Sequence, residues 1–257
     1  MIMYKNIFDT HAHYDDERFS ADAGELLSSF PENGVTGVIT CGVNVESSQK
    51  SIELAEQFDF IYAAVGFHGL DINALTGDYI GDIKRLAQHK KVVAIGETGL
   101  DYHYEKETRE KQLEVFENQI ILANELSLPI IVHDREAHGD TLNLLKKHQP
   151  QGVVHCFSGS AEMAKEILKL GMYIGLGGAV TFKNAVKPVE VAKIVPDNRL
   201  LIETDAPYMS PVPMRGKRCT SLHIPYTAER LAEIRKTTAQ KILNLTNKNA
   251  RELFLEK

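Results

Sequence analysis

The chain has 257 residues, of which 43% are hydrophobic and 25% charged, and its formal net charge is −6. These values are typical of a globular protein and exclude a disordered or fibrous chain. The negative charge argues against a broad basic surface that grips long nucleic acid by neutralising phosphates, although a local basic patch remains compatible with it.

Cysteines are few and widely separated: Cys41, Cys156 and Cys219 form no Cys-x-x-Cys pair. This spacing indicates neither a disulfide framework nor a thiolate zinc site, and it favours a reducing compartment. No apolar run approaches the roughly 18 residues of a membrane span. We therefore expect a soluble, cytoplasmic protein without a membrane segment, and no feature indicates an obligate protein partner.

Short apolar runs recur along the whole chain and predict eight strands. They are residues 7–9, 35–43, 60–68, 92–97, 129–133, 152–155, 172–180 and 200–205. Several are nearly continuous in Val, Ile and Leu, as expected of parallel strands that are covered on both faces. No linker composition divides the chain, so we expect a single domain over residues 1–257.

Segments with helical spacing lie between these runs, for example residues 113–126 and 163–168. Pro31 is expected to end the first helix near Phe30. After the last strand, residues 227–236 and 240–255 predict two amphipathic helices, one closing the repeat and one extra. Eight strands alternating with helices fit either a closed barrel or an open doubly wound sheet, and the residues at the strand ends decide between the two.

Metal-ligating residue types stand where the predicted strands end. His11 and His13 are two residues apart, which places both side chains on one face of a strand. Other runs end in Glu97, His133, His155 and Asp205. Any one of these could simply open a loop, but six at corresponding ends of five strands predict a metal centre. Because catalytic groups of (β/α)8 TIM barrels gather at that end, the pattern favours such a barrel with an extra C-terminal helix.

Nitrogen and oxygen ligands without thiolate favour zinc, with manganese or magnesium as alternatives. Six ligands exceed the need of one tetrahedral ion, so we expect two divalent metal ions. The histidine pair of the first strand is assigned to one ion and His133 with His155 to the other, with Glu97 as the bridge. Asp205 completes the first site and accepts a proton from water, and Glu203 on the same strand face is expected to support it.

These segments resemble the TatD family of metal-dependent hydrolases, which are amidohydrolase-like barrels. The matching segments are DTHAHYD at 9–15, GETGLDY at 96–102, HDR at 133–135, HCFSGS at 155–160, GLGGAVTFKNA at 175–185, ETDAPYMSP at 203–211 and RGKR at 215–218. The resemblance implies a (β/α)8 fold, a one- or two-metal centre at the six positions and phosphodiester hydrolysis. The family is similar to nucleases that remove nucleotides from DNA ends, and some relatives are implicated in removing D-amino acids from tRNA.

Basic residues next to the predicted centre are candidates for substrate binding. Arg215, Lys217 and Arg218 follow the eighth strand, where a loop would overhang the metals, although a solvated run of charge is the alternative. Arg135 follows His133 by two residues and is a candidate for stabilising developing charge. His68 ends the third run and either orients substrate or is a buried structural histidine.

The chain departs from the family pattern in the loops. Cys219, Thr220 and Ser221 follow RGKR where the family usually has Asn-Glu-Pro, Tyr226 replaces a common histidine, and Gly69 replaces a usual proline. Since these changes spare the six ligands, the hydrolytic chemistry is better supported than the substrate.

Three functions fit the sequence to different degrees. The first is a TatD-like deoxyribonuclease that acts on DNA ends or short oligonucleotides, as a 3′–5′ exonuclease on single strands. The second keeps the two-metal centre and hydrolyses an amide, a lactone or a D-aminoacyl-tRNA ester. The third is a non-catalytic metal or nucleic-acid binding protein, which an open site with a poised acid disfavours. Whether the basic residues at 215–218 face the metals separates the first two.

Overall fold

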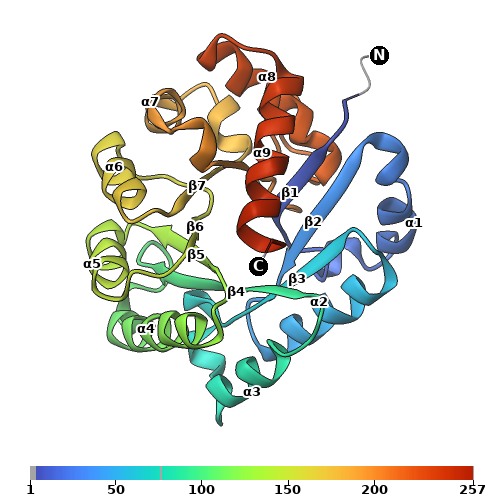
Figure 1. Cartoon of the computed structure of the whole chain (residues 1–257). Coiled ribbons are helices and arrows are strands. Elements are labelled where there is room, and N and C mark those ends of the chain that lie inside the picture. Colours follow the sequence, from blue (N-terminus) through green and yellow to red (C-terminus); the bar gives the residue numbers. More distant parts are fainter. Residues whose placement is uncertain (1–3, 76, 257) are drawn as a thin grey trace.

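The computed structural model describes residues 4–75 and 77–256 and shows eight parallel strands in the order β1 to β8, surrounded by helices (Figure 1). The strands are β1 (Ile7–Ala12), β2 (Val35–Cys41), β3 (Ile61–Val65), β4 (Val92–Asp101), β5 (Ile130–Arg135), β6 (Gly152–Val154), β7 (Tyr173–Leu176) and β8 (Leu200–Ile202). A parallel bridge from Ala12 to Ala206 joins β1 to the segment after β8. The predicted barrel is therefore confirmed over the open sheet.

Helices follow the strands around the outside of the barrel (Figure 1). They are α1 (Ala23–Ser28), α2 (Val45–Gln57), α3 (Tyr79–Leu86), α4 (Arg109–Leu126), α5 (His138–His148), α6 (Ala161–Lys169), α7 (Val186–Ile194), α8 (Ile224–Arg235) and α9 (Ala239–Phe254). The predicted helices over 113–126, 163–168, 227–236 and 240–255 are confirmed. Among the described helices, none is both long enough and apolar enough to cross a bilayer.

Strand β4 extends beyond the run that predicted it, which ended at Glu97. The strand continues to Asp101 because Gly96 and Gly99 take positive φ angles of 146° and 145° and let the chain approach β5 closely. A Cβ atom at Gly99 would lie 2.0 Å from the carbonyl oxygen of His133, so only glycine fits there. The extension brings Asp101 to the same end of the barrel as the predicted ligands.

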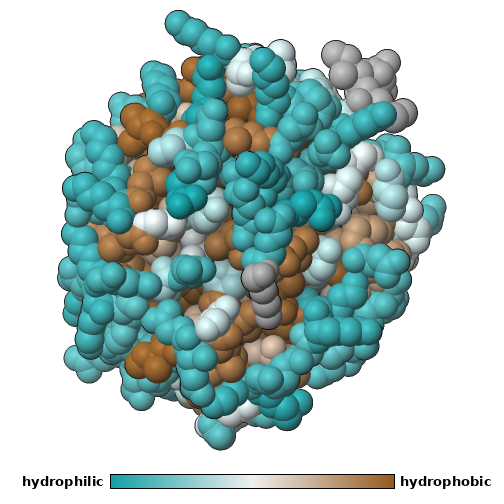
Figure 2. Space-filling model, viewed as in Figure 1, coloured by the Kyte–Doolittle hydropathy of each residue, from teal (hydrophilic) through white to brown (hydrophobic). Residues whose placement is uncertain are grey.

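Helix α9 covers the amino-terminal mouth of the barrel. The side chains of Ala250 and Phe254 pack with a cluster of buried strand residues that includes Phe8, Ile39 and Ile131. In Figure 1 this helix crosses in front of the strands, and in the same view Figure 2 shows apolar side chains around its carboxyl end within a hydrophilic rim. The carboxyl ends of the strands therefore open on the opposite side of the molecule.

Removing the Phe254 ring is expected to destabilise the fold. Phe254→Ala leaves a cavity in the packed mouth of the barrel and should lower the free energy of unfolding by about 3–5 kcal/mol, measured by urea denaturation. Lys248→Ala on the same helix is the control, because Lys248 makes only an exposed ion pair with Glu252, and it should change stability by less than about 0.5 kcal/mol. Equal effects of the two substitutions would contradict the packing role of α9.

Candidate metal centre

The six predicted ligands converge at the carboxyl ends of the strands. They come from β1 and the residue after it (His11, His13), from β4 (Glu97), from β5 (His133), from the residue after β6 (His155) and from the segment after β8 (Asp205). Among the described residues, three groups have ligand atoms within 4.8 Å of one another. The groups are His11, His13 and Asp205; His11, Glu97 and His155; and His68, Glu97 and His133.

Glu97 lies between two pairs of histidines and faces each pair with a different oxygen. Its Oε2 is 3.3 Å from Nε2 of both His11 and His13. Its Oε1 is 3.0 Å from Nδ1 of His133 and 2.9 Å from Nε2 of His155. A carboxylate placed in this way can bridge two cations.

Ring nitrogens within each histidine pair approach one another closely. Nε2 of His11 and Nε2 of His13 are 3.1 Å apart, and Nδ1 of His133 and Nε2 of His155 are 3.2 Å apart. Two imidazole nitrogens at this distance either share one proton or converge on a cation. With a carboxylate between the pairs and no thiolate among the ligands, these residues fit divalent metal ions.

Partners on the far side of the rings set which nitrogen carries the proton. Nδ1 of His13 lies 2.8 Å from the Cys41 carbonyl oxygen and can only donate to it, so in the neutral ring Nε2 keeps its lone pair. Nε2 of His133 lies 3.3 Å from the Asp101 carboxylate, which leaves the lone pair on Nδ1. In both rings the free lone pair is the one that faces Glu97, as metal binding requires.

Burial and neighbouring charge determine the ionisation of the carboxylates. Burial alone would raise the pKa of Glu97, but the imidazoles of His68, His155 and His11 together hold it well below its usual range. The pKa of Asp205 is also lowered despite burial, mainly by His13. For His11, burial and the adjacent His155 lower the pKa, which favours the neutral imidazole that can bind a metal.

His68 is buried against Glu97 in the cluster and lines the cavity that extends toward the loops after β1 and β3. Its Nδ1 accepts a hydrogen bond from the Leu70 amide at 3.0 Å, so in the neutral ring Nε2 carries the proton. That Nε2 lies 3.3 Å from Oε1 of Glu97 and can donate to it. The arrangement makes His68 a hydrogen-bond donor that orients Glu97.

Asp101, which the sequence pattern did not single out, lies beside the cluster. Its Oδ1 accepts from the amides of His103 and Tyr104 at 2.9 Å, and its Oδ2 faces His133. A signal was available, because residues 97 and 101 are four apart on one strand and so share a face. The apolar run that predicted the strand ends at Glu97, so Asp101 fell outside the expected strand.

The structure does not bring the three basic residues of 215–218 to the cluster. Arg218 forms an ion pair with Asp22 at 2.6 Å, and Arg215 stacks over the Phe182 ring at 4.0 Å. Lys217 is not among the described residues that line the two cavities beside the cluster. The guanidinium groups point elsewhere because an acid and an aromatic ring, both distant in sequence, hold them there. Arg135, in contrast, lines both cavities.

Two cavities meet at the cluster and expose it to solvent. One, of about 440 Å³, extends toward α7, and the other, of about 540 Å³, extends toward the loops after β1 and β3. His133, His155 and Asp205 line both of them. Candidate metal ligands thus form the floor of an open cleft that a substrate can enter.

A (β/α)8 barrel with histidines and carboxylates gathered at the carboxyl ends of its strands, below open cavities, defines a metal-dependent hydrolase. The family model described as TatD related DNase matches residues 8–255, and the chain belongs to this family.

Relatives match the chain over nearly its whole length. It is 45% identical over 251 residues to the uncharacterized metal-dependent hydrolase YabD of Bacillus subtilis, covering 96% of this chain and 98% of that protein. It is 32% identical to the 3′-5′ ssDNA/RNA exonuclease TatD of Pantoea ananatis, covering 96% and 99%. The crystal structure of YJJV, a TatD homolog from Escherichia coli K12, matches with a TM-score of 0.91 and 31% identity, covering 97% and 98%.

Ser221, one of the departures from the family pattern, supports the first ligand strand. Its hydroxyl donates to Oδ2 of the buried Asp9 at 2.6 Å and lies 2.8 Å from the Tyr14 hydroxyl. The same Asp9 carboxylate accepts from the Thr204 hydroxyl and the His11 amide. Burial raises the pKa of Asp9 to about 7, against the effect of these donors. Ser221 therefore ties the loop after β8 to the strand that carries His11.

Loss of the Ser221 hydroxyl is expected to destabilise the folded protein. Ser221→Ala removes a donor from a buried carboxylate and an acceptor from Tyr14, which should lower the free energy of unfolding by about 1–3 kcal/mol. Urea denaturation of chelator-treated protein measures this. Ser28→Ala, which removes an exposed hydroxyl bonded to the Gly24 carbonyl, is the matched control and should have little effect. Wild-type stability of Ser221→Ala would show that the contact contributes nothing.

Proposed function

We propose that the protein is a phosphodiesterase that removes nucleotides from the ends of single-stranded DNA in the 3′–5′ direction, with two divalent ions at the six-residue cluster. The observation that carries this proposal is the position of Glu97 between two histidine pairs, each facing its own carboxylate oxygen. The name of the Pantoea ananatis relative, a 3′-5′ ssDNA/RNA exonuclease, supports the choice of substrate.

The contacts support an assignment of ligands to two ions. His11, His13 and Asp205 would hold one ion, His133 and His155 would hold the other, and Glu97 would be shared between them. When bound, two divalent ions polarise the scissile phosphate and make water a stronger nucleophile. Nitrogen-rich ligation favours zinc, and manganese or magnesium are the alternatives.

Asp205 is the proposed general base. Its Oδ1 lies 3.4 Å from His13 and 3.7 Å from His11, and its lowered pKa keeps it ionised. The side chain is 19% exposed, against 5% for Glu97, and it lines both cavities, so water and substrate can reach it. It takes the proton of the attacking water, and that proton can pass to the sugar oxygen that leaves phosphorus. Arg135 stabilises the charge on the phosphate oxygens.

A second candidate function is supported by the placement of the basic residues at 215–218. Arg218 is paired with Asp22 and Arg215 is stacked on Phe182, so neither supplies the phosphate contact that would favour a nuclease. The same centre could polarise a carbonyl, which keeps hydrolysis of an amide, a lactone or a D-aminoacyl-tRNA ester as the alternative.

Elemental analysis tests the two-ion assignment. Protein reconstituted with zinc or manganese and dialysed should hold about two ions per chain, and His133→Ala should hold about one, because Glu97 and the other histidines retain the first site. His103→Ala, which alters an exposed histidine paired with Glu136, should retain both. A wild-type content of one ion or none would contradict the assignment.

End-labelled single-stranded DNA tests the reaction itself. The metal-loaded wild type should release nucleotides from the 3′ end, and Asp205→Asn should slow release by on the order of 10²–10⁴-fold while keeping most of the metal, because it loses the base. Labels at either end reveal the direction of attack. If the wild type releases no nucleotide but turns over a D-aminoacyl ester or a lactone, the second candidate function replaces the first.

A further inference from the structure

The two cavities beside the metal centre differ in the charges that line them. We call them the α7 cavity, which contains Lys187, and the β1 cavity, which contains Asp15 and Asp16. Arg135 lines both. If a polynucleotide is the substrate, its strand has to leave the centre through one of them.

In the α7 cavity the carboxylates beyond the centre lie next to histidines, and Arg135 stacks over the Tyr104 ring at 4.8 Å. Oδ2 of Asp134 lies 2.8 Å from His138, and Oε1 of Glu136 lies 2.8 Å from His103. Neither Lys187 nor Arg135 forms an ion pair with any described residue of the chain. Both side chains are exposed, so their charges are available to a ligand.

The amino-terminal ends of two helices make the electrostatic potential in the α7 cavity more positive. Helices α5 and α7 begin at its wall, at His138 and Val186, and neither has a side chain that caps its first amides. Helix α6, which begins between them in sequence, is capped by Ser160. The positive ends of α5 and α7 favour an anion nearby.

The β1 cavity is lined mainly by negative charge. Asp15, Asp16, Asp71 and Asp101 line it, and Arg135 is the one lysine or arginine among its described lining residues. Such a wall repels a chain of phosphates. Tyr104 and Tyr208, 62% and 43% exposed, also line this cavity. Arg135 lies over one face of the Tyr104 ring at 4.8 Å and Arg18 over one face of the Tyr208 ring at 4.5 Å, so a single base can stack on the opposite face.

We infer that the α7 cavity holds the sugar-phosphate backbone of the strand beyond the scissile bond, with Lys187 as its phosphate contact and Arg135 at the scissile phosphate. The terminal nucleoside lies in the β1 cavity. This inference rests on the proposed nuclease function. It makes Lys187 a residue that selects polynucleotides over small phosphodiesters.

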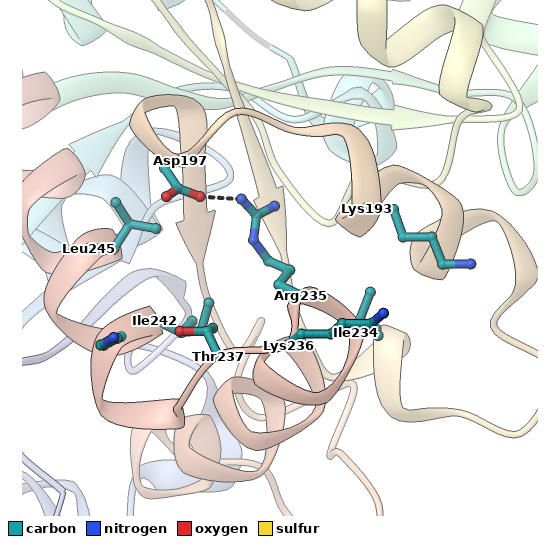
Figure 3. Close-up of a pocket in the computed structure, with 9 residues that line it drawn as sticks. Lys193, Asp197, Ile234, Arg235, Lys236, Thr237, Ile242 and Leu245 are labelled. Atoms are coloured by element: carbon teal, nitrogen blue, oxygen red, sulfur yellow. Dashed lines mark hydrogen bonds and ion pairs between the residues drawn. The ribbon is translucent and has the colours of Figure 1, made fainter.

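Helix α7 also supplies a matched control residue at its other end. Lys193 lines a separate cavity of about 530 Å³ between α7, α8 and α9, shown in Figure 3. There Arg235 pairs with Asp197 and donates to the carbonyls of Ala192 and Val195 at 2.8 Å, so it anchors the carboxyl end of α7. Lys193 has the same charge as Lys187 and is likewise exposed, but it does not line either cavity at the metal centre.

The experiment compares two substrates and three proteins. The substrates are a short single-stranded DNA oligonucleotide and thymidine 5′-(p-nitrophenyl) phosphate, a phosphodiester with no second phosphate. The proteins are the wild type, Lys187→Glu and Lys193→Glu. Lys187→Glu should raise KM for the oligonucleotide on the order of tenfold and flatten its salt dependence, and leave kinetics on the nitrophenyl ester unchanged. Fluorescence anisotropy of a labelled oligonucleotide should show the same loss of affinity.

The outcomes separate this inference from the proposed function. If the wild type hydrolyses both substrates and Lys187→Glu behaves like Lys193→Glu on the oligonucleotide, the assignment of the α7 cavity is wrong and the nuclease stands. An equal loss on both substrates also overturns the assignment, because it would place Lys187 at the reacting phosphate. If the wild type cleaves neither phosphodiester, the nuclease function fails and the inference fails with it.

Discussion

The buried carboxylate of Glu97 is the constraint on which the rest of the site depends. A charge withdrawn from water in this way is costly unless it is surrounded by partners. The barrel supplies them from β1, β5 and the residue after β6, because parallel strands end at one rim and direct successive groups toward its axis. Two histidine pairs then face two oxygens of one carboxylate, a charge distribution that two cations would complete.

Hydrogen-bond acceptors on the outer side of the imidazoles fix the orientation of the rings. A carbonyl oxygen at Cys41 and a carboxylate at Asp101 accept the outer ring protons of His13 and His133. The inner lone pairs are thereby directed at Glu97, and His68 orients the same carboxylate through a hydrogen bond. The glycines that let β4 approach β5 therefore contribute to chemistry as well as packing, since without them the chain could not place Asp101 behind His133.

Sequence patterns predicted the fold, and they predicted the six candidate ligands that the fold brings together, because both depend on local spacing. Apolar runs mark the strands, and the period of two at His11 and His13 marks a shared face. The loop residues escaped prediction because their partners are far away in the chain. Arg218 is held by Asp22 and Arg215 by Phe182, pairings that no local pattern encodes. No local pattern marks Lys187 as a binding residue, because it is a single lysine in a helical segment. It becomes a candidate only because the fold places it beside the metal centre.

The strands of this barrel carry the candidate ligands, and its loops and helix starts form the walls of the cavities. The candidate ligands and their partners stand on or beside strands, and the backbone hydrogen bonds of those strands fix their positions. The cavity walls come from loops and helix starts, where replacements such as Ser221 can be accommodated by local networks. A substitution in a cavity wall can therefore alter substrate binding without moving the candidate ligands, and in our proposal the charge of the α7 cavity selects a polynucleotide.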